Sequence, residues 1–491
     1  MSMTQETEKE KETVVRGFKR RPTKAQWIKC AIACVLYIAW VIWVGNPFLL
    51  LLLPVIVDMY YTHFIPWTFW KNSKNKAFRK VMEWIDAIVF ALVAVYFINI
   101  FLFQNYQIPT SSLEKSLLVG DYLFVSKVSY GPRVPNTPLS FPLAQHTLPI
   151  INTKSYLDWP QWGYKRLKGF GEVERYNIVV FNFPAGDTVA LKIQNPDFYT
   201  LAFYNGGSEV IRRNPDIYGK VVYRPVDRRE NYVKRCVGMP GDTLQIINNI
   251  VYIDGKPLPN PKKMQLNYYV QTNGTRFGEQ NWEALGISKD DRGEENGMNI
   301  VNVEGQQMTL LEYIGFQPNA DGSFNPVYHM PLTAEALNKV KAMPIVTKVI
   351  PEPGFMGGLT YPLGYNDAWT RSDYGPIWIP KKGATIELNR DNMALYERCI
   401  RNYENNKLEE KNGRYWINGK EATSYTFQMD YYWMMGDNRD NSADSRFWGF
   451  VPEDHVIGRP LFVWLSIDKD KSLFQKGGIR FNRIFMNAKN L

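Results

Sequence analysis

The chain has few histidines and few cysteines, and this scarcity limits its chemistry. Among 491 residues there are four of each. Cys30 and Cys34 have no partner pair or nearby histidine, and the other two cysteines are isolated, so the sequence predicts neither a zinc site nor a disulfide framework. A Ser-His-Asp triad is also disfavoured, because no histidine lies in a motif-like setting: they are His63, His146, His329 and His455.

Acidic residues are missing from two stretches near the N-terminus. Residues 16–29 carry six Lys or Arg, residues 71–80 carry five, and neither stretch contains Asp or Glu. The net charge of the whole chain is +10, which by itself fits nucleic acid or anionic lipid as a partner. Both basic stretches border apolar runs, so they favour a role in membrane topology and indicate no nucleic-acid partner.

Long apolar runs are present at residues 27–44, 47–67 and 84–103. About 20 apolar residues cross a bilayer core, so the sequence predicts three transmembrane spans, the first two forming a tight hairpin. Positive charge stays on the cytoplasmic side, which places both basic stretches there. We therefore expect a multi-pass protein of the cytoplasmic (inner) membrane, with the chain after about Phe103 on the extracytoplasmic, periplasmic face.

The remaining chain changes in composition along its length. Strand-like runs and two turn signals, Asp254-Gly255 and Asn418-Gly419, indicate a β-rich part. Between them lies a region rich in polar residues with short helical signals. The predicted domains are a basic cytoplasmic N-terminus (1–26), a membrane anchor (27–104, with its basic loop at 71–80), a β-rich domain (105–257 and 412–475), an inserted α+β subdomain (258–411) and a basic C-terminal tail (476–491).

The most informative segment runs from Gly436 to Gly449. It holds three carboxylates, two arginines, two asparagines and two serines between apolar runs. Polar groups flanked by core residues must satisfy one another, so the segment predicts a fixed hydrogen-bond network. It does not match a calcium loop, because Arg439 replaces an oxygen ligand and Trp448 replaces the closing Glu. We expect no metal and no cofactor.

A serine nucleophile would need a base other than histidine, and a lysine kept neutral by apolar surroundings can serve. Lys115 is expected in solvent, and Lys127 fits a charge on an edge strand. Lys234 would share one strand face with Tyr232 and Cys236. Lys234 therefore ranks first as the candidate base on the residues alone.

Four boxes of the sequence resemble those of type I signal peptidases, in the same order. The resemblance covers roughly residues 84–257 and 412–465. In the first box, Pro-Thr-Ser-Ser-Leu stands where the family usually has Pro-Ser-Gly-Ser-Met, so Ser111 and Ser112 are both candidates, and the spacing to the second box favours Ser112. The boxes are Ile108–Leu113, Gly120–Tyr122, Tyr232–Asp242 and Gly436–Gly449.

The resemblance implies a membrane-anchored, mainly β catalytic domain of the signal peptidase type, with an inserted α+β subdomain. It implies Ser112 as nucleophile and Lys234 as its base. The Ser112 N–H and the Thr110 hydroxyl would stabilise the oxyanion. Ser442 would orient the lysine amine.

Other residues would support the site or bind substrate. Asp444 and Arg446 would form a structural ion pair that holds the loop. Tyr106, Ile108 and Val233 match positions lining substrate pockets, although ordinary core packing explains them equally well.

The implied activity is removal of N-terminal signal peptides from exported preproteins through an acyl-enzyme. The partners are then those signal peptides, the lipid bilayer and, as a further expectation, the secretion machinery. Placing a nucleophile just beyond a transmembrane helix suits this task, since the scissile bond of a membrane-inserted signal peptide emerges at that depth.

Two alternatives remain open at this point. Ser112-x-x-Lys115 fits the Ser-x-x-Lys of penicillin-binding acyl-serine enzymes, but their Ser-Asp-Asn and Lys-Thr-Gly triplets are missing from the sequence. The other alternative is a catalytically silent, membrane-tethered protein that binds secreted chains. Retention of Ser112, Lys234 and Ser442 together argues against it.

Overall fold

The computed structural model describes residues 23–287 and 306–490. The chain divides into two compact units, Met1–Ile98 and Asn99–Leu491. Most of the predicted basic N-terminus (1–22) and residues 288–305 of the predicted insertion lie outside the described residues.

The first unit is helical. Within the described residues, α2 (Lys24–Val44) and α4 (Lys76–Phe101) are the two helices long and apolar enough to cross a membrane. The α2 helix begins after Thr23, whose hydroxyl accepts the Gln26 N–H, and ends at Gly45 with a φ of 66°. Glycine adopts this left-handed conformation without strain, so Gly45 permits the tight turn predicted after the first span.

The helix within the predicted second span, 47–67, is shorter than that range. The apolar helical segment covers Pro47–Thr62 and is irregular, with α3 (Leu53–Val57) between a 3₁₀ turn and a π turn. It stops there because the Asp58 carboxylate accepts the N–H groups of Phe64 and Ile65, which turns the chain out of the helix. The segment is shorter than the roughly 20 residues of a regular span.

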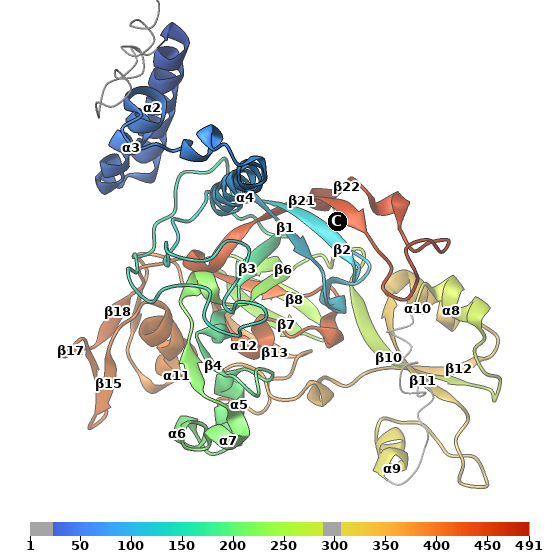
Figure 1. Ribbon diagram of the computed structural model, residues 1–491. Coiled ribbons are helices and arrows are strands. Elements are labelled where there is room, and N and C mark those ends of the chain that lie inside the picture. Colours follow the sequence, from blue (N-terminus) through green and yellow to red (C-terminus); the bar gives the residue numbers. More distant parts are fainter. Residues whose placement is uncertain (1–22, 288–305, 491) are drawn as a thin grey trace, which may run out of the picture. The chain divides into compact units, whose positions relative to one another are not determined.

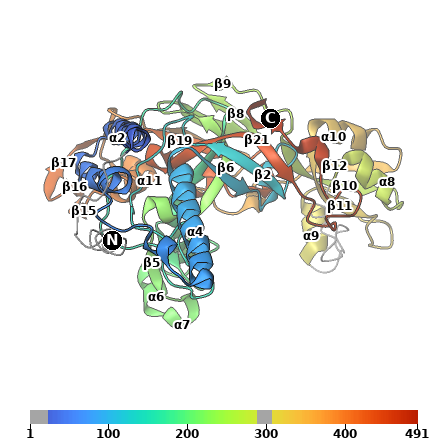
Figure 2. The ribbon, with the colours of Figure 1, turned by 45° about the horizontal axis from the view of Figure 1, so that its top comes forward.

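The second unit is mainly β, as predicted, and its main sheet is antiparallel. Eight strands take part, in the order β1-β2-β21-β3-β6-β19-β20, with β22 also paired to β21 (Figures 1 and 2). Their bounds are β1 Phe103–Gln107, β2 Asp121–Ser126, β3 Ile178–Asn182, β6 Asn231–Gly238, β19 Tyr431–Met435, β20 Val451–Pro452, β21 Val456–Ser466 and β22 Met486–Asn487.

Apolar residues bury both faces of the central strands of this sheet. All five residues of β3 are buried, as expected for a strand covered on both faces. Ile178 and Val180 pack into one core cluster, and Val179 and Phe181 pack into another. The adjacent strand β6 continues both clusters, with Val233 on one face and Cys236 on the other. The residues of β6 therefore lie between two core clusters.

A second sheet follows the order β13-β7-β8-β9, and both predicted tight turns are confirmed. Asp254 and Gly255, with φ of 50° and 75°, connect β8 to β9, and Asn418 and Gly419, with φ of 52° and 82°, connect β16 to β17. The strands of the second sheet are β7 Thr243–Ile247, β8 Ile250–Ile253, β9 Lys256–Pro257 and β13 Tyr374–Trp378. A separate three-stranded sheet consists of β15 Leu408–Lys411, β16 Arg414–Ile417 and β17 Lys420–Ala422.

The predicted inserted subdomain 258–411 is not one structural block. Its first part forms the three-stranded sheet β11-β10-β12 with its own core cluster around Val270, Trp282 and Met330. Its second part joins the rest of the unit, since β13 pairs with β7 and Tyr396 packs in the core with Trp433. The bounds are β10 Gln265–Thr272, β11 Val327–Thr333, β12 Val346–Pro351, α8 Glu279–Leu285, α9 Gln306–Tyr313, α10 Ala334–Lys341 and α11 Arg390–Arg398.

Short elements complete the described part of the second unit. Two of them, α5 and α6, pack together around Phe198, Leu201 and Ile211. These elements are β4 Thr188–Ala190, β5 Val221–Tyr223, α5 Phe198–Tyr204, α6 Ser208–Arg213, α7 Pro215–Tyr218, β14 Thr385–Glu387, β18 Ser424–Thr426 and α12 Ser445–Trp448.

Candidate active site

Ser112 lies in a short 3₁₀ turn, Ser111–Leu113, between β1 and β2. The turn is anchored by its neighbours: Leu113 is 1 % exposed and packs with Ile108 in a core cluster. Ile108 also donates its N–H to the Asp121 carbonyl and accepts the Gly120 N–H, both at 2.9 Å. These contacts fix the backbone around Ser112, which is itself buried.

Lys234 lies on β6 and donates a hydrogen bond from its Nζ to Ser112 Oγ at 2.7 Å. As predicted, it shares a strand face with Tyr232 and Cys236: the ammonium is 5.5 Å from the Tyr232 ring centroid, and Cys236 belongs to the core cluster that Tyr232 also contacts. The lysine is only 5 % exposed. Apolar surroundings and a hydroxyl within hydrogen-bond distance are what a neutral lysine base requires.

Burial lowers the pKa of Lys234 to about 8. The effect is desolvation of the charged amine, and the carboxylates of Asp444 and Asp437 oppose it by favouring the charged form. At pH 7, one unit below this pKa, about a tenth of the amine is neutral, far more than for a lysine with its ordinary pKa.

The other two candidate lysines do not contact the serine in this way. Lys127 directly follows β2, which ends at Ser126. Its side chain is partly buried, whereas the prediction was an exposed charge on an edge strand. Burial, with a further contribution from Arg133, lowers its pKa to about 7. Lys115 Nζ donates a hydrogen bond to the Gly286 carbonyl. This contact does not support a Ser-x-x-Lys arrangement with Ser112.

Gly436 lies where Ser442 and the Ser111–Leu113 turn come close together. A Cβ on this glycine would lie 2.3 Å from Ser442 Oγ and 2.6 Å from the Ser112 carbonyl oxygen, so only glycine fits. Ser442 is buried, and its Oγ has no hydrogen-bond partner among the described residues. The predicted bond from Ser442 to the Lys234 amine is not formed in the structure. Buried hydroxyls usually find a partner, so Ser442 holds unused hydrogen-bonding capacity in the site.

Asp444 and Arg446 form a fully buried, two-pronged ion pair. Arg446 Nε donates to Asp444 Oδ1 and its Nη2 donates to Oδ2, both at 2.9 Å. Burial by itself would raise the pKa of Asp444, but the charge of Arg446 and its hydrogen bonds lower it. The Asp444 carboxylate also accepts the Gly436 N–H at 3.1 Å, so the pair fixes the backbone beside Ser442.

Asn438 and Asp437 connect this loop to the Ser111–Leu113 turn and the residues after it. The Asn438 N–H donates to the Ser112 carbonyl at 3.1 Å, and its side-chain amide donates to the Ser111 carbonyl at 3.2 Å. Asp437 accepts two bonds from Arg235, at 2.8 and 2.7 Å, and one from the Ser116 hydroxyl at 2.6 Å. The density of polar groups in this loop predicted a hydrogen-bond network, but the sequence did not identify residues 111–116 as its partner.

The predicted basic tail, 476–491, is instead packed into the second unit. Arg483 donates to the Asp121 carboxylate at 2.6 Å and to the Ser116 carbonyl at 3.0 Å. β22 pairs with β21 in the main sheet. No motif in the sequence indicated that this segment supports the turn after Ser112.

The remaining predicted residues lie around the serine. Thr110 is exposed and stands next to the 3₁₀ turn. Ile108 is 2 % exposed within a core cluster against which Tyr106 and Val233 pack. Val233 faces the opposite side of β6 from Lys234. These three apolar side chains therefore form one cluster beside Ser112, in part as ordinary core.

Comparisons with known proteins identify a family and named relatives. The model of the family described as signal peptidase, peptidase S26, matches residues 81–295 and 379–465, which together are more than half of the chain. The signal peptidase I of Buchnera aphidicola subsp. Acyrthosiphon pisum (strain APS) is 22% identical over 414 residues, 84% of this chain and 83% of that protein.

Two further relatives carry the same name. The signal peptidase I of Rickettsia conorii (strain ATCC VR-613 / Malish 7) is 22% identical over 435 residues, covering 86% of this chain and 97% of that protein. The signal peptidase I of Haemophilus influenzae (strain ATCC 51907 / DSM 11121 / KW20 / Rd) is 39% identical over 71 residues, 14% of this chain and 20% of that protein.

Proposed function

The chain belongs to the signal peptidase S26 family, and from that premise we propose that Ser112 and Lys234 are its catalytic dyad. The protein is a serine endopeptidase that removes signal peptides from exported proteins. The observation that carries the dyad is the 2.7 Å hydrogen bond from Lys234 Nζ to Ser112 Oγ. It is supported by the burial of both residues and by the lowered pKa of the lysine.

The reaction follows from these two groups. Neutral Lys234 takes the proton of Ser112 as Oγ attacks the scissile carbonyl, and the resulting ammonium then protonates the leaving amine. The mature protein departs, leaving the signal peptide as an ester on Ser112. The lysine, neutral again, takes a proton from water, which attacks the ester and releases the signal peptide. The lysine ammonium returns this proton to Ser112 Oγ as the ester bond breaks, which restores both groups.

Transition-state charge would be stabilised by the Ser112 N–H and the Thr110 hydroxyl. Donors that are fixed before the reaction stabilise an oxyanion best, and the bonds from Asn438 to the Ser111 and Ser112 carbonyls support such rigidity. Ser442 would accept a hydrogen bond from the Lys234 amine after a side-chain rotation. Its unpartnered Oγ supports this role.

The substrate would bind as an extended peptide beside the nucleophile turn. Extended segments add to exposed strand edges while alternate side chains enter shallow pockets. We assign Tyr106, Ile108 and Val233 to the walls of such pockets, since all three pack in the core cluster that anchors the turn. Small residues before the scissile bond would suit a pocket of this kind.

The anchor would lie in the cytoplasmic membrane. α2 and α4 would cross it, and the shorter helical segment Pro47–Thr62, which packs on α2 through the Tyr37 hydroxyl bond to the Leu49 carbonyl at 2.6 Å, would return the chain to the cytoplasmic side. The basic residues 16–29 and 71–80 then both face the cytoplasm. Asn99–Leu491 would lie on the extracytoplasmic face, where the secretion machinery delivers preproteins.

A preprotein cleavage assay with paired variants tests the dyad. Ser112→Ala and Lys234→Ala should each lower kcat/KM by about 1,000-fold or more while remaining folded, since both groups act as one unit. Ser111→Ala is the matched control: its hydroxyl is adjacent to Ser112, and we expect it to retain most activity. Wild-type cleavage by Lys234→Ala, or loss of activity in Ser111→Ala alone, would overturn the assignment.

A further inference from the structure

A cavity of about 630 Å³ lies between α5, α6 and α11, away from the dyad. Its volume is within the range of small-molecule binding sites. Neither Ser112 nor Lys234 lines it. The walls that matter here are formed by Phe198, Tyr199, Arg212, Tyr361, Arg398 and Phe447.

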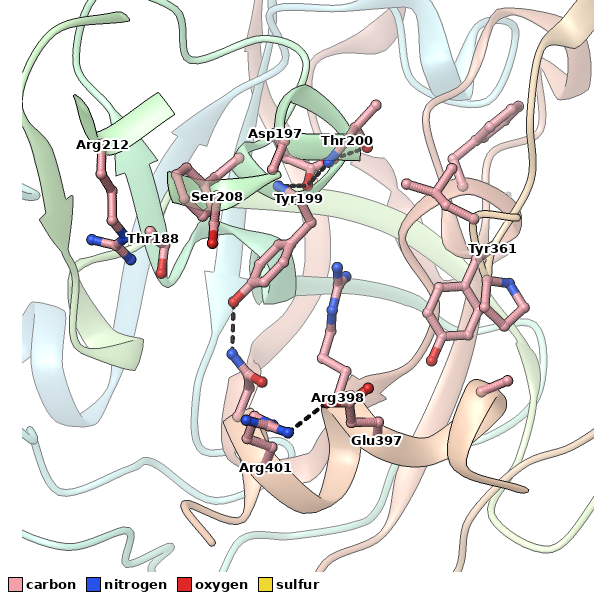
Figure 3. A pocket seen from close by; sticks show the side chains of 17 residues that line it. Thr188, Asp197, Tyr199, Thr200, Ser208, Arg212, Tyr361, Glu397, Arg398 and Arg401 are labelled. Carbon is pink, nitrogen blue, oxygen red and sulfur yellow. Dashed lines mark hydrogen bonds and ion pairs between the residues drawn. The ribbon is translucent and has the colours of Figure 1, made fainter. Parts of the chain in front are cut away.

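Two guanidinium groups reach this cavity against aromatic rings. Arg398 extends from α11 into the space between Tyr199 and Tyr361 (Figure 3). Its guanidinium carbon lies 3.9 Å from the Tyr199 ring centroid, and its Nη1 donates to the Trp448 carbonyl at 3.2 Å. Arg212 approaches from α6, 5.4 Å from the centroid of Phe198. Stacking holds a guanidinium in place while leaving N–H donors for a ligand.

The carboxylates of the cavity are already engaged. Asp197 caps α5, accepting the N–H groups of Tyr199 and Thr200 at 3.0 and 3.3 Å. Glu397 pairs with Arg401 at 2.8 Å. Within residues 23–287 and 306–490, neither Arg212 nor Arg398 forms an ion pair. Three arginines of the lining, Arg212, Arg398 and Arg401, therefore outnumber its two carboxylates, Asp197 and Glu397. Asp197 is close enough to favour the charged form of Arg398 and raise its pKa, although the two side chains form no ion pair.

The wall around Arg398 is also preformed. The Tyr199 hydroxyl donates to Asp187 at 2.5 Å and accepts from the Asn402 amide at 2.6 Å. These bonds fix the ring on which Arg398 stacks. A site whose side chains are already held in place loses less conformational freedom when a ligand binds.

We propose that this cavity is a binding site for an organic anion, a carboxylate or phosphate carried on an aromatic or other flat apolar body. The acidic group would bind Arg398 and Arg212, and the apolar body would pack against Tyr361 and Phe447. Phe447 belongs to α12, directly after Arg446, so the ligand would contact the loop that carries the Asp444–Arg446 pair.

The test is calorimetric titration of the full-length chain in detergent with phenylphosphate and with phenylacetate. 2-Phenylethanol, which lacks the charge, and inorganic phosphate, which lacks the ring, complete the set. We expect the two aromatic anions to bind, the better of them identifying the acidic group, and each of the other two probes to bind at least about tenfold more weakly.

Matched variants locate the site. Arg212→Gln should weaken binding of the aromatic anions by about tenfold, and Arg213→Gln should leave it unchanged, since Arg213 is highly exposed and pairs with Glu209. Arg398→Lys keeps the charge but loses the planar stack, and should also weaken binding. Absence of binding, equal binding of 2-phenylethanol, or equal binding in the wild type and Arg212→Gln would overturn the proposal. Because binding is the readout, the outcome does not depend on the dyad.

Discussion

At the scale of single residues, the site depends on which lysine has both a lowered pKa and a serine hydroxyl within hydrogen-bond distance. Two lysines of the second unit have strongly lowered pKa values, Lys234 to about 8 and Lys127 to about 7, and in both the first cause is burial. Burial alone therefore does not distinguish a base from a bystander. The distinction is the hydroxyl of Ser112 at 2.7 Å from the Lys234 amine.

The pH dependence of cleavage should reveal which lysine acts. With Lys234 as base, kcat/KM is level above about pH 8 and falls about tenfold per unit below it, because the protonated amine cannot accept the serine proton. The measurement is the pH–rate profile on a preprotein for the wild type and Lys127→Met. We expect the same acidic limb and similar activity in both, and loss of cleavage by Lys127→Met at every pH would identify Lys127 as the base instead.

At the scale of elements, the loop Gly436–Gly449 and the turn Ser111–Leu113 form one assembly. Asn438 bonds to the backbone of the turn, and the Asp444–Arg446 pair bonds to the backbone of the loop. Gly436 stands where the two meet. Interfaces packed this closely respond to one added methyl group, since the neighbours have little room to move.

Gly436→Ala should therefore abolish most activity. The new Cβ would require Ser442 and the Ser112 carbonyl to move, and a displacement of about 1 Å at a nucleophile costs on the order of 100-fold in rate. The matched control is Gly163→Ala, because Gly163 has open space around its Cβ position and no positive φ. Preprotein cleavage and thermal melting of both variants are the measurements, and near-wild-type cleavage by Gly436→Ala would contradict this packing.

At the scale of the whole second unit, the β11-β10-β12 sheet is connected to the loop Gly436–Gly449. Arg371 pairs with Glu352 at 2.9 Å and with Asp440 at 3.0 Å, and all three are buried or nearly so. Asn267, on β10, donates its N–H to Asp440 at 2.8 Å. The sheet is therefore connected to the loop through buried charges. Water cannot reach this site to compensate a charge whose partner is removed.

Arg371→Gln tests this connection. Removing one partner of a buried ion pair leaves uncompensated charge and typically costs about 3–5 kcal/mol, so we expect a lower melting temperature and a lower kcat. Arg414→Gln is the control, because its pair with Glu421 is exposed and worth less than about 1 kcal/mol. Equal thermal stability of the two variants would show that the sheet and the loop are energetically independent.

The sequence by itself determined the apolar helices, the mainly β second unit, the two Gly-containing turns and the family. Each depends on local pattern: apolar length, alternation, turn chemistry or a dense motif. It also placed Lys234 on a strand face with Tyr232 and Cys236, since alternation along a strand needs no tertiary information.

Tertiary structure alone decided which residues meet. Local pattern could not reveal that Arg483 holds Asp121, that Asn438 bonds to the Ser112 turn, or that 258–411 divides between two cores, because these contacts join segments far apart in the chain. It also could not show that the segment after Pro47 stops at Thr62, which depends on the bonds of Asp58. Hydrogen bonds and burial between distant segments are properties of the folded chain, and they determine the surroundings of the Lys234 amine.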